Sequence, residues 1–210
     1  MSSPLMLYYC PGHMSFAPHV ILNEIGLPFE RRCLSIKSGD TAQAEFRAVN
    51  PKGKVPVLKT AEGILTESSA ILMYLALRYP GEHLLPDAAV GQAQVVEWLN
   101  WLSSMLPASI ALRLHPYRFT DEQSAWAGIQ ARGQAECESF YQMVEQKLQH
   151  KTWAVSERFT VVDPMLMIFY RWGDLLGLDM SAFPCWQRHT ENMRKRPAVL
   201  KTLATEEITI

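Results

Sequence analysis

Four side chains with different chemistry lie within six residues near the start of the chain, in the segment CPGHMS. They are the thiol of Cys10, the imidazole of His13, the thioether of Met14 and the hydroxyl of Ser15. An apolar segment precedes them, and a helical pattern with Pro18 in its first turn follows. A helix N-terminus carries partial positive charge and free N–H groups, which stabilise an anion. This loop is therefore the first candidate for a chemical site.

A second candidate is the proline of the segment KVPVL, residues 54–58. A cis Val55–Pro56 bond suits a tight turn ahead of a short strand. It would leave the N–H and C=O of Val55 free to pair with an extended peptide. An ordinary edge-strand proline explains the same residues equally well.

The segment LTESSAI, residues 65–71, combines an acid and hydroxyls with the start of an apolar helix. Ser68 and the free N–H groups of the helix could hold a carboxylate, and Glu67 could neutralise an ammonium group. Together they would bind both charges of an α-amino acid head group. Plain helix capping is the simpler explanation of this segment taken alone.

The elements that must position these residues follow two different patterns. Up to residue 79, strands alternate with helices, as in a small α/β domain. Expected strands are 5–9, 29–35 and a hairpin formed by VPVLK and GILTE, and expected helices are 18–25, ended by Gly26, then 41–49 and 68–79.

Residues 80–90 carry prolines and a glycine and predict a linker. The rest of the chain, residues 91–210, predicts an all-helical domain. Its expected helices are 91–106, 121–150, 163–176, 183–194 and 198–204. Thr160 and Asp163, three residues apart before an apolar run, match a capping box that begins the third of these helices.

The composition excludes several classes of protein. A net charge of -1 over 210 residues gives no reason to expect a nucleic acid or an anionic membrane as a partner. No apolar run is long enough to span a bilayer and no secretory signal is present, so we expect a cytoplasmic protein. Four cysteines without a CxxC pair, and histidines without metal-ligand spacing, predict no metal site. Nucleotide-binding and serine-hydrolase motifs are also absent.

Five segments in this order and spacing resemble the cytosolic glutathione transferases over essentially the whole chain, with the bacterial beta class the closest branch. They are LYYCPGHMSFAPHVILNEIGLPFE, NPKGKVPVL, LTESSAI, VEWLNWL and RFTVVDPML. The resemblance implies a thioredoxin-like N-terminal domain, an all-α C-terminal domain and a homodimer. It also implies glutathione as the co-substrate, bound by the N-terminal domain, and an apolar electrophile bound against the helices.

The resemblance also implies roles for individual residues. Val55, ahead of Pro56, would pair its backbone with the cysteinyl part of glutathione. Glu67 and Ser68 would bind the ammonium and carboxylate of the γ-glutamyl end. The remaining glutathione-binding positions implied are Lys37, for the glycyl carboxylate, and Asn100, near the thiol, although a helix-surface amide also explains Asn100.

Two departures from the beta-class pattern bear on the chemistry. The cysteine that touches the sulfur of glutathione is replaced by Met14, and a histidine of the long helix is replaced by Pro107. A thioether cannot form a mixed disulfide, so cysteine-based redox chemistry at residue 14 is excluded. His115 lies two turns farther on and is not counted as a replacement.

The groups left to stabilise a thiolate are the helix N-terminus and a nearby hydrogen-bond donor. We expect Ser15 to be that donor, followed by His13 and then Tyr9; Cys10 is an outside candidate. The expected walls of the electrophile site are Met14, Phe16, Trp101, Leu106, Leu114 and Tyr117. Arg113, Arg118 and His115 could favour an anionic substrate, although solvated basic residues are the simpler explanation.

Three functions are consistent with these features. The favoured hypothesis is an enzyme that conjugates the thiol of glutathione to a small apolar electrophile. The alternatives are a glutathione-dependent disulfide reductase or peroxidase, and a non-catalytic glutathione-binding interaction protein. Turnover, dependence on Cys10 and glutathione binding distinguish the three.

Overall fold

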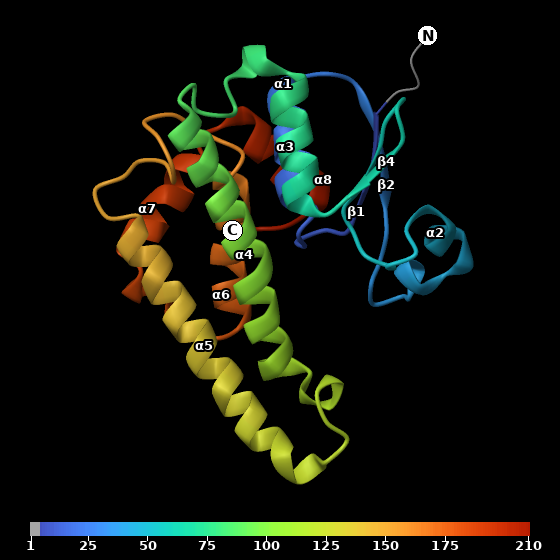
Figure 1. Ribbon diagram of the computed structural model, residues 1–210, viewed down its shortest axis with the longest axis vertical. Helices are drawn as coiled ribbons and strands as arrows, with labels where there is room; N and C mark the ends of the chain where they lie inside the picture. The colour runs from blue at the N-terminus through green and yellow to red at the C-terminus, as the bar shows by residue number, and fades with distance from the viewer. Residues whose placement is uncertain (1–4) are drawn as a thin grey trace.

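The computed structural model describes residues 5–210, and its first half is built on a four-stranded sheet (Figure 1). The strands are β1 (Leu5–Tyr9), β2 (Phe29–Cys33), β3 (Val57–Lys59) and β4 (Ile64–Thr66). Their order is β2-β1-β3-β4, with β1 parallel to β2 and the other neighbours antiparallel. The predicted strand β1 is confirmed, whereas β2 ends two residues earlier than expected.

Alternate residues of β1 face different layers, as the pleat of a strand requires. Leu7 and Tyr9 belong to the main core, with α1 (Phe16–Ile25) and α3 (Ser68–Arg78). Tyr8 packs in a smaller cluster with Phe46 of α2 (Ala44–Val49). The sheet therefore has helices on both sides.

The second half is entirely helical. Two long helices, α4 (Ala89–Leu114) and α5 (Trp126–Lys147), pack along each other (Figure 1). The others are α6 (Asp163–Leu175), α7 (Pro184–Met193) and α8 (Pro197–Glu206). The expected α/β first half followed by an all-α second half is confirmed.

The expected end of the fourth helix at residue 106 is wrong, because α4 continues through Pro107 to Leu114. A proline removes one hydrogen bond of the helix ladder and usually ends the helix. Here the apolar face on the turns around it, at Leu102, Leu106 and Ile110, packs against the core. Burial of that face outweighs the missing bond.

Other boundaries shift by a few residues. The helix expected at 121–150 begins at Trp126, since residues 116–118 and 123–125 form short 3₁₀ turns. A third such turn, Pro80–Glu82, lies in the predicted linker. The expected stop at Gly26 is confirmed, because this residue adopts the left-handed conformation with φ of 76°.

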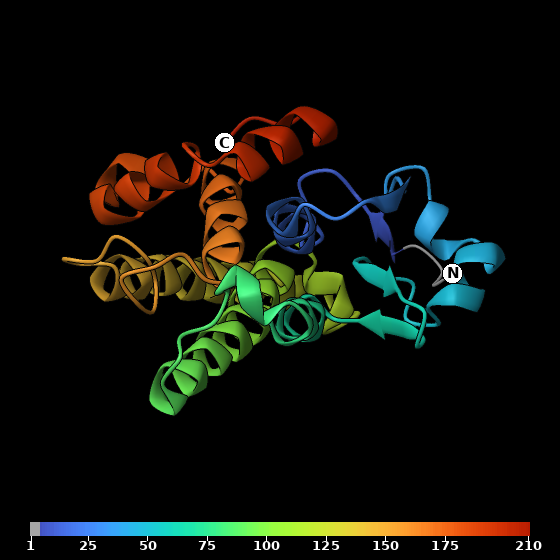
Figure 2. The same ribbon diagram turned by 90° about the horizontal axis from the view of Figure 1, so that it is seen from above.

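One hydrophobic core runs through both halves. It joins Phe16 and Ile71 of the first half to Leu102 and Phe169 of the second. Helix α8, near the C-terminal end of the chain, lies beside α1 (Figure 2). The chain therefore brings its last helix next to the loop that precedes α1. The domain boundaries at residues 79 and 90 stay a prediction.

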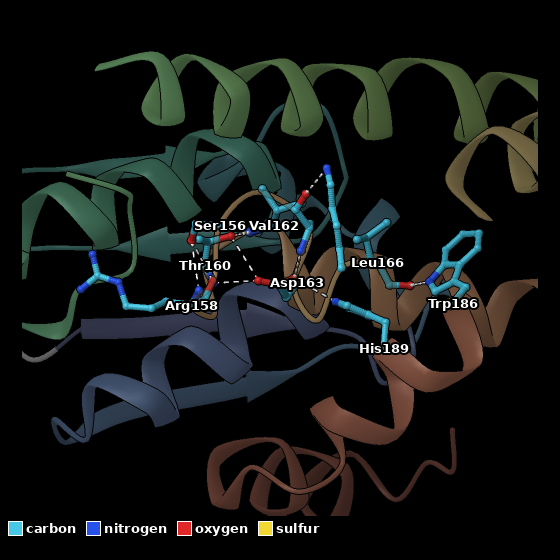
Figure 3. A network of polar contacts seen from close by, with 10 residues as sticks. Ser156, Arg158, Thr160, Val162, Asp163, Leu166, Trp186 and His189 are labelled. Carbon is cyan, nitrogen blue, oxygen red and sulfur yellow. Dashed lines mark hydrogen bonds and ion pairs between the residues drawn. The ribbon is translucent and has the colours of Figure 1, made fainter. Parts of the chain in front are cut away.

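The capping box ahead of α6 is half confirmed (Figure 3). Asp163 accepts hydrogen bonds from the N–H of Thr160 at 2.7 Å and from the N–H of Ala154 at 2.9 Å. The other bond of a capping box, from the N–H of Asp163 to the hydroxyl of Thr160, is not formed. The Thr160 hydroxyl instead accepts from the N–H of Val162 at 3.4 Å. Asp163 also pairs with the buried His189 at 2.8 Å, so this network joins α6 to α7.

Candidate functional site

The loop between β1 and α1 is held closed by Ser15. Its hydroxyl donates to the C=O of Cys10 and accepts from the N–H of the same residue, both at 3.0 Å. Ser15 is fully buried, with 0% of its surface exposed. Its proton is already used and no ligand can reach it in this arrangement, which opposes its expected role as the thiol donor. Ser15 supports the loop from inside.

Cys10 is also buried, and burial raises the pKa of its thiol. A thiol of raised pKa holds little thiolate at neutral pH and is a poor nucleophile. Its place at the end of β1 explains the burial, since the residue packs where the strand leaves the sheet. Cys10 therefore has the character of a structural residue.

Gly12 is fixed by both of its backbone groups. Its N–H donates to Oε2 of Glu206 at 2.9 Å, and its C=O accepts from Nε1 of Trp172 at 3.0 Å. Its φ of +71° is left-handed, and an added Cβ would stand 2.8 Å from a terminal nitrogen of Arg171. Only a glycine fits this turn and this close approach. Helices α6 and α8 thus set the position of the loop.

His13 is exposed and lines a cavity beside the loop. Partial desolvation of its imidazole and the nearby positive charge of Arg171 lower its pKa below the ordinary value. Both effects disfavour the imidazolium form. At neutral pH the ring is therefore neutral, with one N–H to donate.

A polar cleft of about 180 Å³ begins next to the loop. Val55 and Pro56 lie in its wall, and the peptide bond between them is cis, as expected. Among residues 5–210, the backbone N–H and C=O of Val55 have no hydrogen-bond partner. The lining residues are Met14, Asn50, Lys54, Val55, Pro56, Thr66, Glu67, Ser68, Ser103 and Pro107.

The two expected head-group residues, Glu67 and Ser68, both line this cleft. Glu67 forms an exposed ion pair with Lys52, whose ammonium also donates to Thr66 at 2.8 Å. The hydroxyl of Ser68 donates to the C=O of Met14 at 3.1 Å. An ammonium group arriving at Glu67 must compete with Lys52, and Ser68 ties the cleft to the loop.

Three expected site residues line neither this cleft nor the cavity beside His13. Lys37 and Asn100 are exposed to solvent and are not among the lining residues of either space. Tyr9 is buried in the core, its ring centroid 5.1 Å from that of His19. Burial, followed by the neighbouring Cys33, raises the pKa of Tyr9, so its phenol keeps its proton at neutral pH, and it is the position of Tyr9 in the core that opposes the expected role as a donor. The structure therefore does not bring these three to the loop.

The cavity beside His13 is larger and mostly apolar, with a volume of about 500 Å³. It lies between the loop, the C-terminal part of α4 and α6. The lining residues are Pro11, Gly12, His13, Ile110, Leu114, His115, Arg171, Trp172, Leu175 and Leu176. Apolar walls with a few polar groups are typical of small-molecule sites.

The expected electrophile wall is only partly found there. Leu114 lines the cavity, and Met14 lies at the adjoining end of the polar cleft. Phe16 and Leu106 have no exposed surface, so as core residues they must be removed from the expected wall. Two other expected residues lie outside both spaces: Trp101 packs against Phe140, and Tyr117 is exposed beside His115.

One face of α4 borders both spaces. Ser103 and Pro107 line the polar cleft, whereas Ile110 and Leu114 line the apolar cavity. Their spacing of four, three and four residues places them on one side of a helix. The loop residues continue this arrangement, with Met14 in the cleft and His13 in the cavity. The two spaces therefore lie next to each other along one face of α4 and along two consecutive loop residues.

Several residues that line the two spaces were not predicted from the sequence. Ser103 lies on the same face of α4 as Pro107, and this helical spacing could have indicated that both line the site. The inference would have required α4 to continue past Pro107, which was not expected. Arg171 and Trp172 reach the cavity from α6, and no local pattern in the sequence indicates this. Their placement depends on how α6 packs against α1.

From residue 5 to residue 210, no three or more His, Cys, Asp or Glu side chains gather into a group able to hold a metal ion. No helix in this range is long and apolar enough to cross a membrane.

Two family models match the chain. The model of the glutathione S-transferase N-terminal domain matches residues 3–77, and that of the C-terminal domain matches residues 127–197. Among curated proteins, glutathione S-transferase GstA of Escherichia coli O157:H7 is 30% identical over 209 residues, covering 96% of this chain and 98% of that protein.

Solved structures give the same result. A glutathione transferase homologue from Sulfitobacter, with bound glutathione, has a TM-score of 0.90 at 26% identity, covering 98% of this chain and 99% of that one. A bacterial beta class glutathione S-transferase from Sphingomonas chungbukensis has a TM-score of 0.84 at 27% identity, covering 97% and 100%.

Proposed function

Because the chain belongs to the glutathione S-transferase family, we propose that it conjugates the thiol of glutathione to small electrophiles held in the apolar cavity. Glutathione would lie in the polar cleft, with its cysteinyl backbone paired to Val55. Glu67 and the backbone N–H of Ser68 would bind the γ-glutamyl head group, since the hydroxyl of Ser68 already donates to the C=O of Met14. This agrees with the glutathione bound in the Sulfitobacter homologue.

The observation that supports this proposal is that consecutive loop residues, His13 and Met14, line the two neighbouring spaces. A peptide in the cleft beside Met14 would present its sulfur toward His13 and the cavity. An electrophile in the cavity would then lie within reach of the sulfur, and attack would become effectively intramolecular. Catalysis would rest mainly on position and on stabilisation of the thiolate.

The thiolate would be stabilised by groups on the exposed side of the loop. The N–H of Met14 has no hydrogen-bond partner among residues 5–210 and lies at the start of α1. His13 can donate one N–H, and Ser103, whose hydroxyl pairs with that of Ser69 at 2.7 Å, also lines the cleft. Ser15 and Tyr9, proposed as donors from the sequence, would act indirectly, by supporting the loop and the core.

Steady-state conjugation of chlorodinitrobenzene tests the proposal. The thiolate attacks the aryl carbon, a C–S bond forms, the C–Cl bond breaks, chloride leaves, and the thiol proton passes to solvent. We expect saturable kinetics in both substrates and a rate well above the uncatalysed reaction. Calorimetric binding of glutathione without turnover of any aryl halide would instead support the non-catalytic binding protein.

The reductase alternative is less well supported. Met14 has no thiol, and burial raises the pKa of Cys10, the nearest protein thiol. A disulfide-reduction assay with a Cys10→Ala variant distinguishes the two, since only a protein-thiol mechanism requires Cys10.

The assembly and the location of the protein also stay proposals. We propose a homodimer, which fits the large apolar side chains exposed on α3 and α4, Leu77 and Val90, at 65% and 69%. Light scattering after size exclusion would measure the mass directly. A cytoplasmic location and a role in detoxification follow from the same family resemblance, and cell fractionation would test the location.

A further inference from the structure

Arg171 lines the apolar cavity and has no ion-pair partner within residues 5–210. Its side chain leaves α6 half-buried, and its Nε donates to the C=O of Thr209 at 3.2 Å. Within the same residues, its two terminal nitrogens make no hydrogen bond. A guanidinium in this state offers two parallel donors, the geometry that a carboxylate matches.

The surroundings strengthen this charge. Most of the cavity wall is hydrocarbon or indole, which lowers the local dielectric constant relative to open solvent. The apolar lining residues are Ile110, Leu114, Trp172, Leu175 and Leu176. A half-buried cation in such a place attracts an anion more strongly than an exposed one does.

The other basic residues near this end of the molecule differ from Arg171. Arg113 donates to the C=O of Leu176 at 2.5 Å and does not line the cavity. Arg118 lies over the ring of Tyr117, at 6.0 Å, and is not part of the wall either. The two arginines that the sequence suggested for an anionic substrate are therefore not placed to bind one.

Arg171 is also next to the reacting end of the loop. A terminal nitrogen of its guanidinium would be 2.8 Å from a Cβ on Gly12, and its charge acts on His13. The carboxylate of Glu206, which also acts on His13, is already bound by His19 and by the N–H of Gly12. Within residues 5–210, Glu206 forms no ion pair with Arg171.

We propose that this cavity selects electrophiles that carry a carboxylate on an apolar body. The terminal nitrogens of Arg171 bind the carboxylate, and the apolar wall binds the body. The electrophilic carbon then faces Met14 and the sulfur of glutathione. This inference rests on the proposed conjugation and names the substrate class of the same site.

A matched pair of substrates tests it. Chlorodinitrobenzoate and chlorodinitrobenzamide have the same leaving group and nearly the same shape, and only the first is anionic. Each enzymatic kcat/KM is divided by the uncatalysed rate constant of the same compound. A charge-assisted bidentate contact predicts a normalised preference of about 10-fold or more for the benzoate.

Variants assign that preference to Arg171. In Arg171→Gln we expect the ratio of the two normalised values to fall to about one, whatever the absolute rates become. Arg171→Lys should keep part of the preference, because an ammonium is a point charge without the fork. Arg118→Gln, an exposed arginine outside the cavity, is the control and should keep the full ratio.

Each result bears on one proposal. No turnover of either compound would contradict the conjugating function itself. Turnover of the amide with no preference for the benzoate would overturn the anionic substrate class and leave the function standing. A preference for the benzoate that persists in Arg171→Gln would contradict the binding of the carboxylate by Arg171. If Arg171→Gln does not fold, Arg171→Lys is the test. A benzoate-to-amide ratio in Arg171→Lys equal to that of the wild-type enzyme would contradict bidentate binding of the carboxylate by the guanidinium.

Discussion

His19 and Glu206 form a hydrogen-bonded pair inside the protein although 187 residues separate them in the chain. Nδ1 of His19 lies 2.8 Å from Oε1 of Glu206, and neither side chain has exposed surface. The second carboxylate oxygen accepts from the N–H of Gly12 at 2.9 Å. The end of α8 therefore fixes both α1 and the loop in front of it.

Removing this carboxylate should loosen the loop. In Glu206→Ala, two buried donors lose their acceptor, so we expect the free energy of unfolding to fall by about 2–4 kcal/mol. Glutathione turnover should fall as well, because the loop that carries His13 and Met14 loses its anchor. Urea unfolding and steady-state kinetics measure the two effects.

Lys201→Ala is the matched control, since its exposed side chain lies on the same helix and makes no side-chain hydrogen bond within residues 5–210. Its unfolding free energy should change by less than about 0.5 kcal/mol. A Glu206→Ala protein as stable as this control would show that the pair does not anchor the loop.

Ser15→Ala separates support of the loop from contact with the sulfur. The buried N–H of Cys10 loses its acceptor, so we expect a loss of about 1–3 kcal/mol in unfolding free energy. Ser103→Ala, at the open wall of the cleft, should leave stability nearly unchanged and lower kcat. Unchanged stability in Ser15→Ala with a raised thiol pKa of bound glutathione would instead make Ser15 the direct donor.

Glu67 should contribute to glutathione affinity more than to stability. Its ion pair with Lys52 is exposed, and such pairs contribute only about 0–1 kcal/mol. We expect Glu67→Gln to raise the Kd for glutathione by about 10-fold or more in calorimetry, through loss of the ammonium contact. Glu62→Gln, an exposed acid bonded to Tyr74, is the control. Equal affinity in both variants would place the γ-glutamyl head group elsewhere.

His13 should titrate below its ordinary pKa of 6.5, because partial desolvation of the ring and the charge of Arg171 disfavour the imidazolium form. The unfolded chain then binds the proton more readily than the folded protein does. The contribution of His13 to stability is therefore complete above about pH 6.5 and is lost as the pH falls toward the lower, folded value. Proton NMR should show this pKa rising again in Arg171→Gln, and a histidine that titrates normally in both proteins would contradict the assignment.

Local patterns predicted most of the fold. The apolar run at Leu5–Tyr9, the stop at Gly26 and the proline after Val55 each depend on neighbouring residues only, and each is confirmed. Pro107 was misleading, because its cost to the helix is local while the packing that outweighs it comes from other elements. Propensity alone cannot weigh these two effects.

The site was predictable only where a single segment supplies it. The wall of the cleft at Val55, Glu67 and Ser68 comes from short motifs and was found. Ser15 has the right chemistry at the right position, but its burial depends on a bond back to Cys10 that the sequence does not reveal. Arg171 joins the site through the packing of α6, so only the tertiary structure identifies it.

The most direct test is the thiol pKa of glutathione bound to the protein, because this peptide thiol is the proposed nucleophile and the protein supplies none of its own. Thiolate absorbance in the ultraviolet, followed across pH with saturating glutathione, measures it. We predict a bound pKa at least about one unit below that of a free thiol, about 8.5–9. A bound thiol that titrates like free glutathione would contradict the claim that the loop and cleft activate it.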